Sequence, residues 1–179
     1  TGIVRRIDDL GRVVVPKEIR RTLRIREGDP MEIFTNRDGE VILKKYSPIG
    51  EIDAFAKQYA ESLAAVSGCY VVISDRDQVI AVSGGVKKEY IGRRISHELE
   101  EIMEQRRTVN TDTDNVKTIT IIDGQDVSDM GQIIFPIICE GDVIGSVVLM
   151  SKTEKQQVSD TEKKLVSVAA DFLGRQMES

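Results

Sequence analysis

The chain has 179 residues, a net charge of −5, 40% hydrophobic residues and 31% charged residues. This balance is typical of a folded, soluble protein and excludes a disordered chain. Apolar runs fall short of the roughly 18 residues that a membrane span needs, and the first residues do not resemble a signal peptide. We therefore expect a cytoplasmic protein with no membrane partner.

Positive charge is concentrated at the N-terminal end. Residues 1–26 carry eight Lys/Arg against three Asp/Glu, whereas residues 48–179 carry fourteen against twenty-two. A basic end on an acidic protein indicates that this end meets an anionic partner while the remainder has another task.

Residues 1–47 have the pattern of a small β-rich domain with one short helix. The missing N–H of proline costs nothing at the first position of a helix, so Pro16 predicts the helix start. Ile19 and Leu23 lie four residues apart and predict that one helix face packs inward. The elements that we expect are strands at 3–7 and 13–15, the helix from Pro16, and strands at 31–35 and 40–45.

Asp38-Gly39 separates the last two of these strands and predicts a type I′ turn, which needs positive φ at both central residues. A unit of this size buries too little apolar surface to be stable alone. We therefore expect an obligate dimer.

Residues 48–50 have the composition of a linker, and residues 51–179 form a second predicted domain. Apolar residues at helical spacing predict two amphipathic helices. The stripe of helix 51–66 is Ile52, Phe55, Ala56, Tyr59, Leu63 and Val66. The stripe of helix 160–177 is Leu165, Val168, Ala169 and Phe172, preceded by a capping box of Ser159 and Glu162.

Strands alternate with turns between these two helices. An antiparallel sheet with both helices packed together on one face gives an α+β fold. The expected elements are strands at 69–74 and 79–83, a mostly helical stretch at 87–107, a strand at 116–122, and a hairpin of 133–139 and 142–150 that turns at Glu140-Gly141.

The stretch TGIVRRIDDLGRVVVPKEIRRTLRIREGDPMEIF, with the trailing VILKKY, resembles the AbrB-like swapped-hairpin transcription factors. The resemblance covers residues 1–46, and its core GR-V-hydrophobic-P-x-E-I/L-R-R is highly specific. It implies an intertwined dimer in which the hairpins of two chains form one core, with an arginine-rich surface facing double-stranded DNA.

The same resemblance implies which side chains contact DNA. Arginine suits this role because its planar guanidinium can bind a phosphate, or guanine O6 and N7, through two parallel hydrogen bonds. No predicted helix is long enough to serve as an ordinary recognition helix, so we expect readout through backbone contacts and DNA deformability. Arg5, Arg12, Arg20 and Arg21 match the contacting arginines of the family, Arg6 matches a basic neighbour, and Lys17 and Arg24 are additional basic positions, of which Lys17 joins the candidate set.

The second half resembles a GAF-type sensor domain in its element order. The NKFDE signature of cyclic-nucleotide-binding GAF domains is missing, so the resemblance does not point to that ligand. A small-molecule ligand of another class and a purely assembling role both remain open. The resemblance implies a tetramer assembled through helices 51–66 and 160–177, and the whole chain resembles a group of sporulation regulators.

No residue cluster in the sequence indicates catalysis, a cofactor or a metal site. His97 is the only histidine, Ser83-Gly84-Gly85 lacks the lysine of a phosphate-binding loop, and Cys69 and Cys139 lie in apolar strands. The carboxylates Asp112, Asp114, Asp123 and Asp126 lack the spacing of a calcium loop. We expect a nucleoid-associated DNA-binding transcription regulator and not an enzyme.

Two other classes compete with this interpretation. The first is an antitoxin that neutralises a toxin through its C-terminal part, because the swapped-hairpin fold also occurs in antitoxins. Antitoxins usually continue as a short flexible tail, whereas some 130 ordered-looking residues follow here. The second is an enzyme regulated by DNA, for which the sequence offers no pairing of nucleophile and base.

Overall fold

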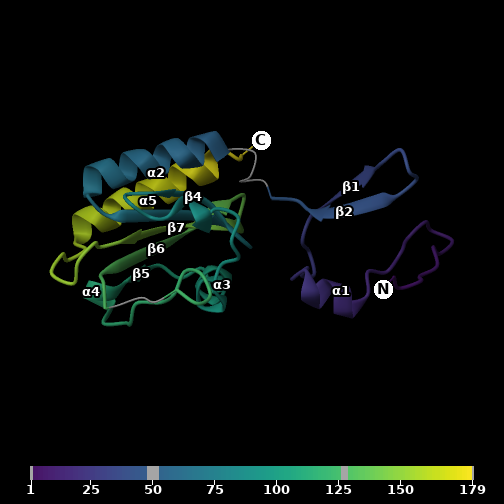
Figure 1. The fold of residues 1–179 in the computed structure, drawn as a ribbon, viewed down its shortest axis with the longest axis horizontal. Helices are drawn as coiled ribbons and strands as arrows, with labels where there is room; N and C mark the ends of the chain where they lie inside the picture. Colours follow the sequence, from purple (N-terminus) through teal and green to yellow (C-terminus); the bar gives the residue numbers. More distant parts are fainter. Residues whose placement is uncertain (1, 48–52, 126–128, 179) are drawn as a thin grey trace. The chain divides into compact units, whose positions relative to one another are not determined.

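The computed structural model describes residues 2–47, 53–125 and 129–178, and the predicted linker at 48–50 lies outside these ranges. The chain divides into two compact units (Figure 1). Unit 1 is Thr1–Tyr46 and unit 2 is Ser47–Ser179.

Unit 1 contains one short helix and one hairpin. The helix α1 is Lys17–Thr22, and the strands β1, Met31–Thr35, and β2, Val41–Lys45, pair antiparallel. Within the connecting loop only Gly39 has a positive φ, at 80°, so the predicted type I′ turn is wrong. Asn36 closes a longer loop instead, because its side-chain oxygen accepts the N–H groups of Asp38 and Glu40 at 3.1 and 2.9 Å.

The strands predicted at 3–7 and 13–15 are not formed. Residues 2–15 contain a turn in which the Asp8 N–H donates to the Arg12 carbonyl at 3.0 Å, and no strand. A strand exists only where a neighbouring strand takes up its backbone N–H and C=O groups. These segments have β-branched sequence but no such neighbour within unit 1.

The start and the packing of α1 also differ from the prediction. Pro16 is the residue before the first helical turn, with φ −56° and ψ 146°, rather than its first residue. Ile19 and Leu23 are 36% and 51% exposed, so the face expected to pack inward is not buried in unit 1 as the structure describes it.

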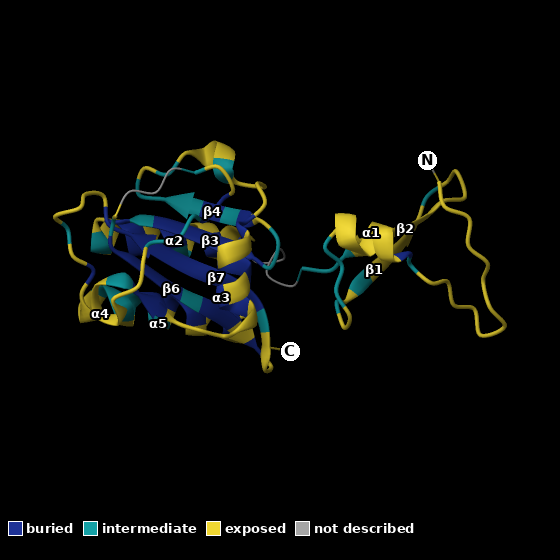
Figure 2. Cartoon of the chain, turned by 90° about the horizontal axis from the view of Figure 1, so that it is seen from below, coloured by how far each residue is buried: buried dark blue, intermediate teal, exposed yellow. Residues whose placement is uncertain are grey.

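Unit 1 as a whole leaves its apolar side chains in contact with solvent, as the predominance of exposed residues in Figure 2 shows. Both faces of the hairpin are affected, because Ile33 and Phe34 point to opposite sides and both are exposed. The exposed set is Ile3, Val4, Ile7, Leu10, Val13, Val14, Ile19, Leu23, Ile33, Phe34, Val41, Ile42 and Leu43.

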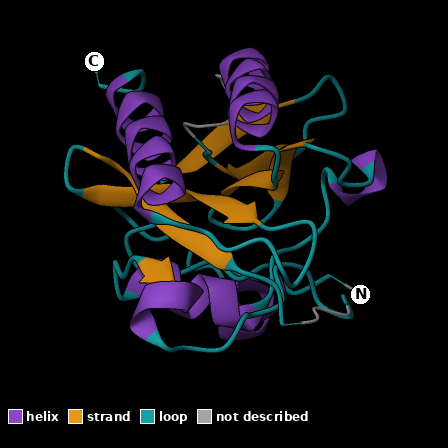
Figure 3. Cartoon of the chain, turned by 90° about the vertical axis from the view of Figure 1, so that its left-hand side faces the viewer, coloured by secondary structure: helices purple, strands orange, loops and turns teal. Residues whose placement is uncertain are grey.

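Unit 2 is built on a five-stranded antiparallel sheet in the order β4-β3-β7-β6-β5. Two long helices, α2 and α5, contact each other and cover one face of this sheet, as predicted (Figure 3). The elements are α2 Asp53–Ser67, β3 Tyr70–Asp75, β4 Val79–Ser83, the 3-10 helix η2 Lys88–Tyr90, α3 His97–Glu104, β5 Val109–Asn110, α4 Thr111–Asp114, β6 Gln132–Cys139, β7 Asp142–Met150 and α5 Asp160–Arg175.

Each face of the sheet has its own apolar core. Alternation along β3 sends Val71 and Ile73 toward α2 and α5, and Val72 toward the opposite face. The opposite face is covered by α3 together with the irregular segment around Ile121 and Ile122. The α+β class that the sequence predicts is confirmed.

The buried stripes of the two long helices differ in part from those predicted. On α5 the buried residues are Val166, Ala169, Ala170 and Leu173, whereas Val168 is 60% exposed and Phe172 is 36% exposed. On α2 the buried residues are Ala56, Ala60, Leu63 and Ala64, whereas Phe55 and Val66 are exposed. Each helix therefore carries a second, exposed apolar face in addition to its buried one. The predicted stripes combined residues from both faces. Ile52 lies outside the described residues.

The strand predicted at 116–122 is also not formed. Its alternating side chains lie in an extended segment without a partner strand, and Ile122 makes only an isolated bridge with Ile95. The side chain of Gln132, which is fully buried, replaces that partner. Its amide oxygen accepts the Ile119 N–H at 3.0 Å, and its amide nitrogen donates to the Ile119 carbonyl at 3.1 Å.

Several turns and termini follow the sequence closely. Glu140 and Gly141 both have positive φ, 48° and 88°, and close the hairpin of β6 and β7 at the predicted position. The predicted capping box of Ser159 and Glu162 is confirmed at the start of α5. Among the residues described, none of the helices is both long and apolar enough to cross a membrane.

Candidate nucleic-acid interface

The turn at residues 8–12 holds Arg12 in a defined orientation. Asp8 accepts the N–H groups of Leu10 and Arg12 on Oδ1, at 3.0 and 2.8 Å, and the Arg12 Nε on Oδ2, at 2.8 Å. Hydrogen bonds from the backbone and then the side chain of Arg12 lower the pKa of Asp8 below its usual value. The Arg12 side chain nevertheless stays 70% exposed, so its guanidinium is ordered and also accessible.

The helix α1 presents three more cations. Arg20 and Arg21 lie in its last turn, and Lys17 is its first residue. All three are exposed. A six-residue helix limits how far these side chains can separate, since successive residues rise by about 1.5 Å.

The six predicted DNA-binding residues therefore fall on three consecutive segments of unit 1. Arg5 and Arg6 lie in the extended segment before the turn, Arg12 in the turn, and the remaining three on α1. All six are exposed, as a phosphate contact requires. Their roles as DNA contacts remain a prediction.

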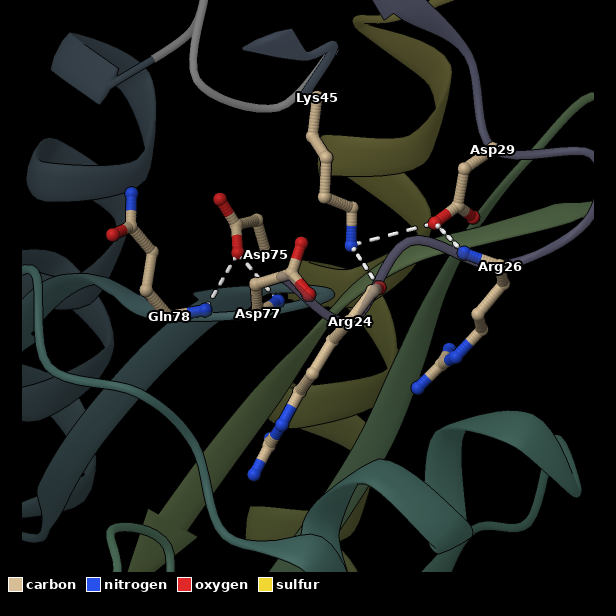
Figure 4. Close-up of polar contacts among 7 residues, drawn as sticks. All are labelled: Arg24, Arg26, Asp29, Lys45, Asp75, Asp77 and Gln78. Atoms are coloured by element: carbon tan, nitrogen blue, oxygen red, sulfur yellow. Dashed lines mark hydrogen bonds and ion pairs between the residues drawn. The ribbon is translucent and has the colours of Figure 1, made fainter. Parts of the chain in front are cut away.

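Lys45 has a different role from these cations. Its Nζ donates to the carbonyl of Arg24 at 2.9 Å and pairs with Asp29 at 3.4 Å (Figure 4). Asp29 also accepts the backbone N–H of Arg26 at 2.9 Å. This largely buried cluster fixes the turn after α1 to the end of the hairpin, so Lys45 has a structural role in unit 1.

The carboxylate of Asp75 in unit 2 is almost completely buried. Asp75 is 4% exposed, and burial raises its pKa. Its Oδ1 accepts the N–H groups of Asp77 and Gln78, both at 2.7 Å (Figure 4). The Ser47 hydroxyl donates to its Oδ2 at 3.1 Å. Through the bonds to Asp77 and Gln78, Asp75 closes the turn between β3 and β4, which gives this carboxylate a structural role.

The other chemically active residues that the structure describes in unit 2 form no catalytic or metal site. Burial raises the pKa of the thiols of Cys69 and Cys139, so both are poor nucleophiles. His97 is exposed and faces Glu100 and Glu101, at 3.6 and 3.4 Å. Across the described ranges no group of His, Cys, Asp or Glu could hold a metal ion.

Two family models together match most of the chain. Residues 51–178 match the family described as "Stage V sporulation protein T C-terminal, transcription factor". Residues 4–51 match "Antidote-toxin recognition MazE, bacterial antitoxin".

Individual relatives agree with these matches. The chain is 56% identical over 178 residues to stage V sporulation protein T of Bacillus subtilis (strain 168), covering 99% of this chain and 98% of the relative. It is 60% identical over 48 residues to the transition state regulatory protein AbrB of the same organism, covering 27% of this chain and 49% of the relative. The predicted resemblance of the N-terminal segment to AbrB-like proteins is confirmed.

The fold of unit 2 has a clear structural relative. The second GAF domain of DevS from Mycobacterium smegmatis superimposes with a TM-score of 0.56 at 12% identity, covering 70% of this chain and 92% of that one. At this identity the likeness concerns the fold alone. Unit 2 therefore has the predicted GAF-like fold.

Proposed function

The chain belongs to the stage V sporulation protein T family of transcription factors and is a transcription regulator of that family, and we propose that it binds double-stranded DNA through the arginines of unit 1. The functional division in this proposal follows the predicted domains, residues 1–47 for DNA and residues 51–179 for assembly and sensing. It acts in the cytoplasm on the nucleoid and has no enzymatic step.

The first part of the proposal is that two copies of unit 1 intertwine. The extended segments at 2–7 and 13–15 have strand-forming sequence and no partner strand, and the hairpin exposes apolar residues on both faces. A second chain would supply the missing strands and cover both faces. Burial of so many side chains, at about 25 cal/mol per Å², would be the main stabilising term of the domain.

The observation that carries DNA binding is the ordered but exposed guanidinium of Arg12 beside further exposed cations. Asp8 Oδ2 accepts the N–H of Arg12 Nε at 2.8 Å, which orients the guanidinium, and the Arg12 side chain stays 70% exposed. Dimerisation doubles the candidate set of Arg5, Arg6, Arg12, Lys17, Arg20 and Arg21. Such an array binds phosphates and releases counterions, so affinity should fall steeply with salt.

The second part of the proposal is that unit 2 joins two such dimers into a tetramer. The outward faces of α2 and α5 carry an apolar surface in which the rings of Tyr59 and Phe172 lie 5.2 Å apart. Phe55, Val66 and Val168 extend it. Exposed apolar surfaces of this kind mark sites of protein association. A small molecule bound by the GAF-like fold would be the signal that this assembly transmits.

The test is fluorescence-anisotropy titration of promoter DNA across a salt series. An Arg12→Ala, Arg20→Ala, Arg21→Ala variant is compared with the wild type, after light scattering has confirmed the same oligomeric state. We expect the variant to bind more weakly and with a flatter salt dependence. Equal binding by the two proteins would contradict the proposal.

The match of residues 4–51 to an antitoxin family favours one other candidate function. In that case a small toxin would co-purify with the chain from its native host. The chain continues after the matched segment with residues 53–125 and 129–178, which form a packed α+β unit rather than a short tail. The transcription-regulator assignment rests on the match of this second unit.

A further inference from the structure

Positive charge gathers at one edge of unit 2, although the unit is strongly acidic. The segment 84–94 carries four Lys/Arg against one Asp/Glu, whereas residues 48–179 as a whole carry fourteen against twenty-two. All four cations are exposed, and so is Lys152, which follows β7. We call these five residues the basic edge: Lys87, Lys88, Arg93, Arg94 and Lys152.

The segment 84–94 runs along the whole length of β4, the last strand at one side of the sheet. It leaves directly after Ser83 and returns to the other end of the strand, where the Val79 N–H donates to the Arg93 carbonyl at 2.9 Å and the Gly92 N–H to the Val79 carbonyl at 2.8 Å. Five strand residues measure about 17 Å. The cations are thus distributed over a fixed length.

Two glycines directly after β4, Gly84 and Gly85, fix the place where the segment leaves the sheet. Gly84 has φ +80°, and a Cβ at this position would lie 2.1 Å from the Cys69 carbonyl oxygen. A Cβ on Gly85 would lie 3.3 Å from the ring of Tyr70. Only glycine allows the chain to approach β3 this closely, so the start of the basic edge is held in place.

Aromatic rings order two of the cations without neutralising them. The Arg93 guanidinium lies 5.5 Å from the centroid of the Tyr90 ring, and the Lys152 ammonium lies 5.5 Å from that of Tyr70. Lys87 pairs loosely with Glu89 at 3.8 Å. Within the described part of the chain, Lys88, Arg93 and Arg94 form no ion pair, so their charges are available to an external anion.

We propose that the basic edge is a second DNA contact. It binds backbone phosphates of the same DNA duplex that unit 1 binds. Each DNA strand carries one phosphate per 3.4 Å of helix axis, so an edge of about 17 Å can meet several phosphates. The edge offers no groove-inserting element and would therefore contribute affinity rather than sequence preference.

The basic edge lies on β4 and the segment after it, whereas the apolar surface proposed for assembly lies on α2 and α5. Assembly through those helices therefore uses other residues.

This inference rests on the proposed DNA binding by unit 1, and the test separates the two. A Lys88→Gln, Arg93→Gln, Arg94→Gln variant is compared with a matched Lys117→Gln, Lys155→Gln, Lys164→Gln variant, which removes three exposed cations outside the basic edge. The probe is a labelled duplex of promoter DNA longer than the whole wild-type footprint, so that any phosphates bound by the basic edge are present. Anisotropy is measured across a salt series.

We expect the edge variant to flatten the slope of log affinity against log salt by about 0.9 for each phosphate that the edge no longer neutralises, while the matched variant keeps the wild-type slope. Equal slopes for the two variants would overturn the inference and would leave the edge to an acidic protein partner. A wild type that does not bind DNA would instead contradict the proposed function. Because Lys88 is exposed on η2, a single Lys88→Glu variant provides a second test with little risk to folding, and an unchanged slope would again overturn the inference.

Discussion

The last turn of α5 lies directly against β6 at Gly174 and Ile138. A Cβ on Gly174 would lie only 2.1 Å from the carbonyl oxygen of Ile138, so the helix and the strand approach as closely as their backbones allow. Leu173, next to Gly174, is fully buried and depends on the same approach.

Gly174→Ala should therefore destabilise unit 2, although alanine favours helices. The methyl group must push the helix away from the sheet, and overpacking of this kind costs about 1–3 kcal/mol. Urea denaturation followed by circular dichroism measures the effect. Lys164→Ala, at an exposed position of α5, is the control and should change stability little. A stability gain for Gly174→Ala would show that the helix can shift freely.

The capping box at the start of α5 should make stability depend on acid. The Ser159 hydroxyl donates to the Glu162 carboxylate, the Ser159 N–H donates to it at 2.8 Å, and the hydroxyl bond is the main cause that lowers the pKa of Glu162. A depressed pKa in the folded state stabilises the protein above the pKa of the unfolded chain, and this stabilisation is lost as the pH falls through the folded value.

Glu162→Gln should remove this contribution. The difference in unfolding free energy between wild type and variant should be largest near neutral pH and should shrink below about pH 4.5, the ordinary range of a glutamate. Urea unfolding across a pH series measures it. A difference that stays constant with pH would mean that the charge of Glu162 has no part in the cap.

Asp8→Ala tests whether the order of Arg12 matters for DNA binding. Removing a negative charge near phosphates should by itself strengthen binding, whereas loss of the Asp8 hydrogen bonds frees Arg12 and the turn. We expect the second effect to dominate and the affinity to fall several-fold. Asp9→Ala removes the same charge from the neighbouring exposed residue and should bind as well as the wild type or better. Anisotropy titration at one salt concentration compares the three proteins.

Charge placed on the outward face of α5 should prevent tetramer assembly. Val168 is 60% exposed and Phe172 lies against Tyr59, so a Val168→Glu, Phe172→Glu variant interrupts the proposed contact without entering the core. Light scattering should show the mass of a dimer with an unchanged circular dichroism spectrum. Lys117→Glu, Lys155→Glu, at two exposed positions outside α2 and α5, is the control. A tetramer formed by the Val168/Phe172 variant would place the assembly surface elsewhere.

The sequence predicted most of unit 2 because its signals are local. The Glu140-Gly141 turn, the Ser159 capping box and the long strand pair depend on residues close together in the chain. The predicted stripe of α5 combined residues of its buried face with residues of a second, exposed apolar face. The spacing of apolar residues shows that they share a side of the helix, but not which of them a neighbouring element covers. Val166 is fully buried whereas Val168 is 60% exposed, although the two side chains are the same.

The strands that were predicted but not formed have two physical causes. Residues 116–122 alternate like a strand, yet the buried side chain of Gln132 supplies the hydrogen bonds at Ile119 that a neighbouring strand would supply. Residues 3–7 and 13–15 need a partner that unit 1 itself does not contain. For the candidate DNA contacts, the sequence identified the cations, but only the structure shows that Asp8 orients Arg12 and that Lys45 has a structural role.

If the two-sided apolar hairpin of unit 1 is completed by a second chain, as proposed, the protein becomes sensitive to its own abundance. If the partner strands come from a second chain, completing unit 1 is a bimolecular event, and its stability rises with protein concentration by mass action. The folding of the packed core of unit 2 needs no partner of this kind. Occupancy of DNA sites would then increase more steeply than in proportion to the number of copies per cell.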